Sequence, residues 1–289
     1  MSMTTGVMAA AVVGGGRHAE VGRAPLPEPA AGQALVRIEG CGVCASSLPV
    51  WEGRPWFSYP LEPGAPGHEG WGTVEAVGAE VDGLEPGQRV GLLSEHAFAE
   101  YDVAPAELCV PLGAPVPLEP VACAINALRR SDVRAGQRVA VVGIGFLGRI
   151  VAALAERAGA EVMRVKRDDV VEGPFELVIE CAGTQSALDT ASALVAKRGR
   201  LVVVGYHQDG PRTVDLQSWN WRGLDVVNAH ERDPAVYVEG MRAGAELLAA
   251  GELDLEPLLT HRFPLDRLDD AFEAARMRPP GFVKAWVEP

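Results

Sequence analysis

The feature that most constrains the fold is a glycine turn between an apolar run and an amphipathic segment. Residues 139–142 are Val-Ala-Val-Val, a run that suits a buried parallel strand. Gly143, Gly145 and Gly148 follow at the spacing of the dinucleotide-binding fingerprint, and apolar residues over 150–158 recur at helical spacing. Such a turn at a helix N-terminus cradles a pyrophosphate. The alternative is an ordinary glycine-rich turn, and a second strand predicted at 161–165 argues against it.

Composition limits the number of domains, the kinds of partner and the compartment of the protein. The chain has 289 residues, 48% of them hydrophobic, which is enough for two domains with real cores. A formal net charge of −13 argues against nucleic acid or an anionic membrane as a partner. No apolar run is long enough to span a bilayer, and no signal peptide is evident. Five cysteines, an odd number, indicate a reduced cytoplasmic protein without a disulfide framework.

The early chain, residues 8–118, is predicted to be β-rich, with short strands at 9–13, 34–38, 72–77 and 89–93. Two of its loops carry side chains that bind zinc in proteins. The first loop holds Cys41, Cys44 and Ser46, and the second holds His68 and Glu69. Cys41 and Cys44 also form a CxxC pair, for which a redox role is the alternative. No clear long helix follows them, which weakens that alternative.

A third candidate stands at the predicted start of a helix. Pro120 suits the first turn of a helix, and Glu119 precedes it. Glu119 is therefore either a further metal ligand or a charge that complements the helix dipole.

Together these pieces resemble the medium-chain, zinc-dependent alcohol dehydrogenases. The resemblance covers nearly the whole chain and implies an α/β fold with three parts. These are a β-rich GroES-like catalytic domain over 1–118, a Rossmann domain with a doubly wound parallel sheet over 119–234, and a C-terminal return over 235–289. The matching pieces are the Gly-Val-Cys-x-Ser loop at 42–46, Gly-His-Glu at 67–69, residues 74–78 and 86–90, Glu119-Pro120, the glycine fingerprint and the return at 258–287.

The resemblance assigns roles residue by residue. Cys44 and His68 correspond to the first two ligands of the catalytic zinc. Glu119 corresponds to the third ligand position of the polyol, sorbitol-type branch. Glu69 matches the acid beside the metal, which in the family either binds zinc directly or stands behind its ligands. Ser46 matches the hydroxyl that relays the substrate proton.

Two departures from the family pattern and one competing ligand bear on these assignments. Ser47 stands where the family usually has an Asp, which removes a carboxylate that would orient the ligands. No Cys lies between Cys44 and Cys109, so the four-cysteine loop of a structural zinc is missing and we expect one catalytic zinc only. Cys123 is a weaker rival of Glu119 as a ligand.

The adenosine end of the cofactor site also departs from the family. A carboxylate after the second Rossmann strand would select NAD, but Lys166 and Arg167 occupy this place. Two cations favour a 2′-phosphate, so we predict NADP rather than NAD. The alternative is a solvated charge cluster, with Asp168 or Asp169 still available for the ribose. Only residues 169–176 precede the next strand, so the Rossmann domain is predicted to be shortened.

The sequence thus predicts an NAD(P)-dependent, zinc-dependent oxidoreductase. It transfers a hydride between a nicotinamide and a secondary alcohol or ketone, for which the resemblance suggests a polyol, sugar or cyclitol. One alternative is a zinc-independent quinone or enone reductase of the same superfamily. Another is a non-enzymatic nucleotide-binding protein on this scaffold. By family analogy we also expect a homodimer that pairs through the strand at 224–228.

Overall fold

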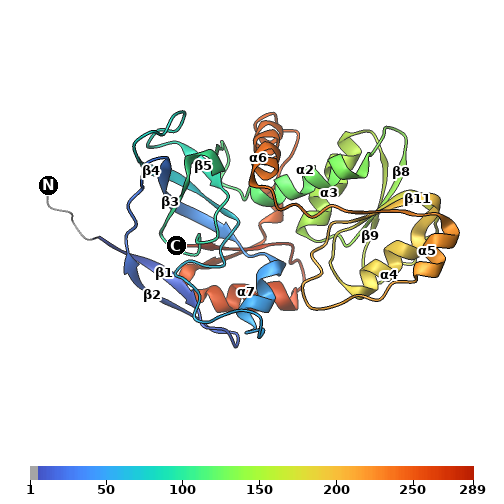
Figure 1. The fold of residues 1–289 in the computed structure, drawn as a ribbon, viewed down its shortest axis with the longest axis horizontal. Coiled ribbons are helices and arrows are strands. Elements are labelled where there is room, and N and C mark those ends of the chain that lie inside the picture. The colour runs from blue at the N-terminus through green and yellow to red at the C-terminus, as the bar shows by residue number, and fades with distance from the viewer. Residues whose placement is uncertain (1–5) are drawn as a thin grey trace. The chain divides into compact units, whose positions relative to one another are not determined.

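The protein is described here over residues 6–289 by a computed structural model (Figure 1). It divides into two compact units. The first runs to Pro120 and resumes at Tyr237, and the second spans Val121–Val236. The first unit is β-rich and the second holds a parallel sheet with helices, so the predicted α/β class is confirmed. None of the helices in residues 6–289 has the length and apolar character that crossing a membrane requires.

The first unit is built on a seven-stranded sheet in the order β13-β14-β3-β4-β5-β7, with β6 paired to β3, and on the antiparallel hairpin β1-β2. The C-terminal strands therefore complete a sheet that the N-terminal strands begin. Its elements are β1 (Val7–Val13), β2 (Ala19–Pro25), β3 (Gln33–Gly42), α1 (Leu48–Trp51), β4 (Gly70–Val77), β5 (Arg89–Leu92), β6 (Tyr101–Pro105), β7 (Cys109–Pro111), β13 (His261–Pro264), α7 (Leu268–Met277) and β14 (Ala285–Glu288).

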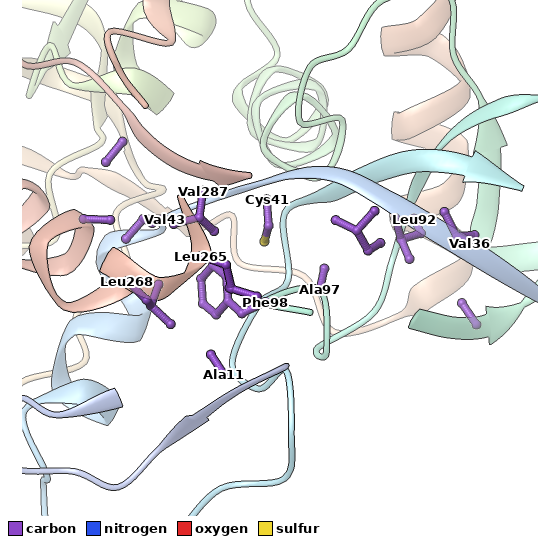
Figure 2. Packing of buried hydrophobic residues seen from close by; sticks show 14 of the residues in the cluster. Ala11, Val36, Cys41, Val43, Leu92, Ala97, Phe98, Leu265, Leu268 and Val287 are labelled. Atoms are coloured by element: carbon purple, nitrogen blue, oxygen red, sulfur yellow. The ribbon is translucent and has the colours of Figure 1, made fainter. Parts of the chain in front are cut away.

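The core of this unit joins residues from both ends of the chain (Figure 2). Val36 of β3 and Phe98 of the loop before β6 share one buried cluster with Leu268 and Val287 of the return. Phe272 of α7 is fully buried and its ring stacks on Trp51, with centroids 5.4 Å apart. Stacked aromatic pairs contribute about 0.5–1.5 kcal/mol beyond their burial. The C-terminal return is therefore part of this unit's core.

The second unit contains a five-stranded parallel sheet in the order β12-β11-β10-β8-β9. Its inner strands are largely apolar and buried, as in β8, where four of five residues are buried. Its elements are β8 (Arg138–Val142), α3 (Phe146–Arg157), β9 (Glu161–Val165), β10 (Phe175–Glu180), α4 (Gln185–Leu194), β11 (Val195–Val203), α5 (Leu216–Arg222) and β12 (Asp225–Asn228); α2 (Glu119–Ser131) and α6 (Pro234–Ala249) cross the unit boundaries.

The sheet is short on the side of β9. A full Rossmann sheet carries a further strand beyond this one, but here the chain passes from β9 to β10 and β9 ends the strand order. Val165 is its one fully buried residue. The nine residues between the two strands are too few for a crossover helix and a strand, which explains the shortened sheet.

The strand β11 follows the preceding helix without a loop. It begins at Val195, directly after α4 ends at Leu194. The extra residues form an irregularity, because Phe175 pairs with Val195 but Leu177 pairs with Arg200. Arg198 adopts a left-handed backbone (φ 58°) within it. Hydrophobic periodicity does not signal such a bulge.

Candidate active site

The candidate metal site forms where two neighbouring strands meet. β3 and β4 are antiparallel, with Cys41 opposite Gly70, so the end of β3 lies beside the start of β4. Cys44 follows β3, and His68 and Glu69 directly precede β4. The Cys44 thiol, a His68 ring nitrogen and a Glu69 carboxylate oxygen lie within 4.8 Å of one another. The fold thus brings Cys44 of the first loop next to the adjacent residues His68 and Glu69 of the second loop.

Local hydrogen bonds fix the orientation of the His68 ring. Its Nδ1 lies 3.0 Å from the Pro66 carbonyl oxygen, which only accepts, so Nδ1 donates. Ser47, which is buried, donates its hydroxyl to the same carbonyl oxygen (3.5 Å). This leaves Nε2 as the nitrogen for a metal ion, and the Ser46 hydroxyl lies 3.3 Å from it. The Ser46 hydroxyl therefore lies beside the one ring nitrogen of His68 that is available to a metal ion.

The Glu69 carboxylate is buried and paired with a lysine. Glu69 is 1% exposed and Lys284 is 5% exposed, and the Lys284 Nζ donates to Glu69 Oε1 over 2.6 Å. Burial lowers the pKa of Lys284, but the negative charges of Glu69, Cys44 and Glu119 outweigh it and raise that pKa. The sequence alone does not single out Lys284, because nothing near it in the sequence distinguishes it from other lysines.

The site concentrates negative charge around His68. Burial disfavours the imidazolium, but a hydrogen bond that the His68 ring donates to the Cys44 sulfur, together with the charges of Cys44, Glu119 and Glu69, raises the pKa of His68 to about 10. Glu119, the first residue of α2, therefore acts on the site through its charge. A thiolate, an imidazole and a carboxylate make a zinc donor set, and a bound cation displaces the proton that these anions hold on His68. The residues present fit a zinc ion.

The predicted cofactor turn has the conformation that its glycines suggest. Gly143 follows β8 with φ 94°, a left-handed value that favours glycine. Gly145 is the N-cap residue of α3. A Cβ atom on Gly148 would lie 2.0 Å from the Gly143 carbonyl oxygen, so this position has no room for a side chain. The turn and the N-terminus of α3 together form the geometry of a phosphate cradle.

The predicted adenosine edge follows β9. Lys166 and Arg167 are exposed there, directly after the last residue of the strand. The carboxylate of Asp169 accepts a hydrogen bond from the Lys166 backbone N–H (2.8 Å), which closes the turn. The Asp169 carboxylate is thus hydrogen-bonded to the backbone, while the Lys166 and Arg167 side chains are exposed to solvent.

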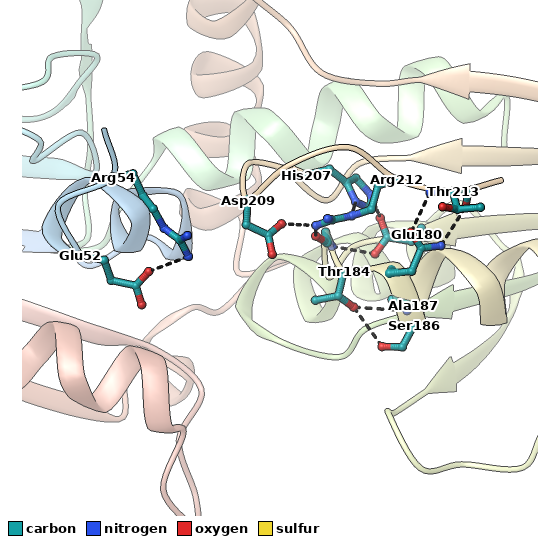
Figure 3. A network of polar contacts seen from close by, with 12 residues as sticks. Glu52, Arg54, Glu180, Thr184, Ser186, Ala187, His207, Asp209, Arg212 and Thr213 are labelled. Atoms are coloured by element: carbon teal, nitrogen blue, oxygen red, sulfur yellow. Dashed lines mark hydrogen bonds and ion pairs between the residues drawn. The ribbon is translucent and has the colours of Figure 1, made fainter. Parts of the chain in front are cut away.

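A buried polar network supports the loops beyond β10 and β11 (Figure 3). Glu180, at the end of β10, is fully buried, and its Oε1 accepts hydrogen bonds from the backbone N–H groups of Ala182 and Gly183. Arg212 donates to Nδ1 of His207 (2.8 Å), so the His207 proton resides on Nε2 and is donated to Glu180 Oε2 (3.1 Å). Every member of the network is satisfied, so it rigidifies both loops.

This network stands behind the glycine turn. A Cβ atom on Gly143 would lie 2.7 Å from Cβ of Ala182, so the loop that Glu180 orders packs against the turn. The sequence alone does not reveal this network. Its one sign in the sequence is Glu180, an acid that directly follows the apolar run 177–179 and would need hydrogen-bond partners if buried.

Comparison with known proteins identifies the family. A family model of the alcohol dehydrogenase GroES-like domain matches residues 30–114, and a model of zinc-binding dehydrogenases matches residues 158–278. Sorbitol dehydrogenase from Homo sapiens is 27% identical over 86% of this chain and 87% of its own length. A 2-dehydro-3-deoxy-L-galactonate 5-dehydrogenase from Pseudoalteromonas atlantica is 25% identical over 90% of this chain and 92% of its own length.

Solved structures share the fold. A candidate zinc-binding dehydrogenase from Sinorhizobium meliloti 1021, crystallised with NADP, superposes with a TM-score of 0.83 at 23% identity. The match covers 98% of this chain and 100% of that one, and confirms the GroES-like and Rossmann arrangement as the fold class. The two family models together cover more than two thirds of the sequence. This chain belongs to the zinc-dependent, alcohol-dehydrogenase-like branch of the medium-chain dehydrogenase/reductase superfamily, a family of oxidoreductases.

Proposed function

We propose that this oxidoreductase uses zinc and NADP to interconvert a secondary alcohol and its ketone, with a polyol, sugar or cyclitol as substrate. The observation that carries the proposal is the close grouping of Cys44, His68 and Glu69, with the Ser46 hydroxyl at the metal-binding nitrogen. The names of the two related enzymes, a sorbitol and a galactonate-derivative dehydrogenase, support the substrate class.

Cys44 and His68 supply two of the three zinc ligands in this proposal. The geometry favours Glu69 as the third ligand, because its carboxylate belongs to the group within 4.8 Å. The resemblance favours Glu119, whose charge acts on His68. Zinc content separates the two assignments, since Gln in place of the true ligand weakens binding far more than Gln in place of the other acid.

Each group at the site has a separate part in the proposed reaction. A bound zinc ion would polarise the substrate oxygen, and a bound nicotinamide cofactor would accept hydride from the carbon that carries this oxygen. Ser46 accepts the hydroxyl proton of the alcohol and passes it toward solvent, to which it is partly exposed. Loss of this proton and of the hydride together converts the alcohol to its ketone. In the reverse direction, Ser46 returns the proton to the substrate oxygen.

Lys166→Asp is expected to shift preference from NADP toward NAD. The substitution removes a cation from the adenosine edge and adds an acid that repels a 2′-phosphate. Hydrogen bonds between charged groups contribute about 1.5–3 kcal/mol, so the ratio of kcat/KM values for NADP and NAD should fall by about 10- to 100-fold. Steady-state kinetics with both nucleotides measures this ratio.

Lys197→Asp is the matched control, because Lys197 is also exposed in the second unit but lies in β11. It makes the same change of charge and should leave the ratio unchanged. An equal ratio in wild type and Lys166→Asp would show that Lys166 does not select the cofactor.

A substrate panel tests the reaction itself. Polyols, sugars, cyclitols, simple alcohols, quinones and enones are offered to the purified protein with each nucleotide. We expect NADP reduction by members of the polyol class. Reduction of quinones or enones alone, by protein without zinc, would support the zinc-independent reductase instead. Absence of binding to either nucleotide in calorimetry would support the non-enzymatic alternative.

The homodimer and the cytoplasmic location stay predictions. β12 lies at one edge of the parallel sheet, where pairing with a second copy requires it to be. All five cysteines are free thiols in the structure, as a reducing compartment allows.

A further inference from the structure

A buried cation stands at the metal site, and the mechanism above does not use it. The Lys284 Nζ lies 2.6 Å from Oε1 and 2.5 Å from Oε2 of Glu69, although 215 positions separate the two residues in the chain. Both side chains are almost fully buried. A buried charge is costly unless it is paired, so the fold retains each of these charges because of the other.

The main chain holds Lys284 in place. Its carbonyl oxygen accepts hydrogen bonds from the His261 backbone N–H (3.1 Å) and the Thr260 hydroxyl (3.3 Å). On the other side, the Val43 backbone N–H donates to the carbonyl of Ala285, the next residue (2.9 Å). These hydrogen bonds hold the backbone carbonyl groups of Lys284 and Ala285 in place at the start of β14. The Lys284 side chain therefore extends from a fixed backbone position.

The Glu69 carboxylate lies between the Lys284 ammonium group and Gly42. A Cβ atom on Gly42 would lie 2.0 Å from Glu69 Oε2 and 3.0 Å from the Lys284 Cε, so the carboxylate occupies the space that this glycine leaves open. The Lys284 Nζ donates to Oε1 and also lies 2.5 Å from Oε2, which accepts no further hydrogen bond within residues 6–289. The carboxylate therefore has one fixed orientation and retains acceptor capacity for a metal ion.

We propose that Lys284 is a positioning residue of the zinc site, which fixes the Glu69 carboxylate where it meets Cys44 and His68. Its positive charge also offsets the anionic donors, so a divalent cation and Lys284 together balance the thiolate and the carboxylates of Glu69 and Glu119. This inference rests on the proposed function, because it assumes that the site binds zinc.

Lys284→Met tests the proposal, because it keeps an unbranched apolar side chain and removes the donor. Loss of a group that orients a metal ligand costs about 10- to 100-fold in metal affinity, so we expect zinc binding to weaken by that factor. Competition with a chromophoric chelator measures the affinity. The absorption bands of the cobalt-substituted protein should also change, since they report ligand geometry. Lys284→Arg, which keeps a charged donor, should restore most of the affinity.

A double-mutant cycle shows whether Lys284 acts through Glu69. The loss caused by Lys284→Met should largely disappear in a Glu69→Gln background. Native zinc affinity with native cobalt bands in Lys284→Met would overturn the proposal, and so would an equal loss in both backgrounds. Absence of zinc binding by the wild type would instead refute the proposed function, so the two failures are distinguishable.

Folding of the variants is checked by the thermal midpoints of their zinc-free forms. The double variant removes both buried charges and leaves no unpaired one. If Lys284→Met alone does not fold, Gly42→Ala provides the test, because its methyl group displaces the carboxylate and crowds the Lys284 side chain without removing the ammonium group. We expect weaker zinc binding in that variant, and unchanged affinity there would contradict the proposal.

Discussion

Cys44→Ala is expected to lose bound zinc and to lower turnover by at least about 10³-fold, while the variant keeps its native fold. The thiol is one of three donors that meet within 4.8 Å, and its removal leaves two. A metal that polarises the substrate oxygen contributes several kcal/mol to the transition state, and each 1.36 kcal/mol is a factor of ten in rate. Zinc analysis and initial rates measure both effects.

The fold should survive because Cys44 is only partly buried and lies outside the strands. Cys109→Ala is the matched control: this thiol is buried in β7 of the same unit and is not part of the metal site. It should retain zinc and turnover. Normal turnover in Cys44→Ala, with Cys109→Ala behaving identically, would refute the metal assignment.

Gly148→Val is expected to weaken NADP binding by at least about 100-fold. A Cβ atom at this position would lie 2.0 Å from the Gly143 carbonyl oxygen, so the turn must open and its N–H groups can no longer converge on the phosphates. Overpacking of this kind costs about 1–3 kcal/mol before any ligand is bound. Calorimetric titration with NADP measures the loss.

Zinc content provides the internal control for Gly148→Val. The glycine turn belongs to the second unit and the zinc ligands to the first, so the variant should bind zinc normally. Gly22→Ala is a further control, since a Cβ atom there meets nothing within 4 Å. Native NADP affinity in Gly148→Val would show that the turn does not cradle the cofactor.

The parts of the account that depend on local sequence could be predicted. The strand before Gly143, the turn and the helix after it form one continuous segment, so periodicity and glycine spacing identify them. Cys44, His68 and Ser46 belong to two short motifs, and the structure brings these residues together. In these cases the order and spacing of the residues within short motifs carry the information, although no single residue does so by itself.

The parts that depend on distant contacts could not be predicted. Lys284 precedes an ordinary apolar strand, and its function follows only from its pairing with a carboxylate 215 positions away. The same holds for His207 and Arg212, whose importance comes from the buried Glu180. A single sequence does not show which polar residues become buried together, because long-range sheet pairing decides this.

Removal and restoration of zinc tests the central claim most directly. The purified protein is analysed for metal, dialysed against a chelator until zinc-free, and then titrated with zinc, and NADP-dependent oxidation of its best secondary alcohol is measured at each stage. The account predicts one zinc per chain, loss of at least about 10³-fold of turnover in the zinc-free protein and recovery with one equivalent of zinc. Full turnover by the zinc-free protein would contradict it.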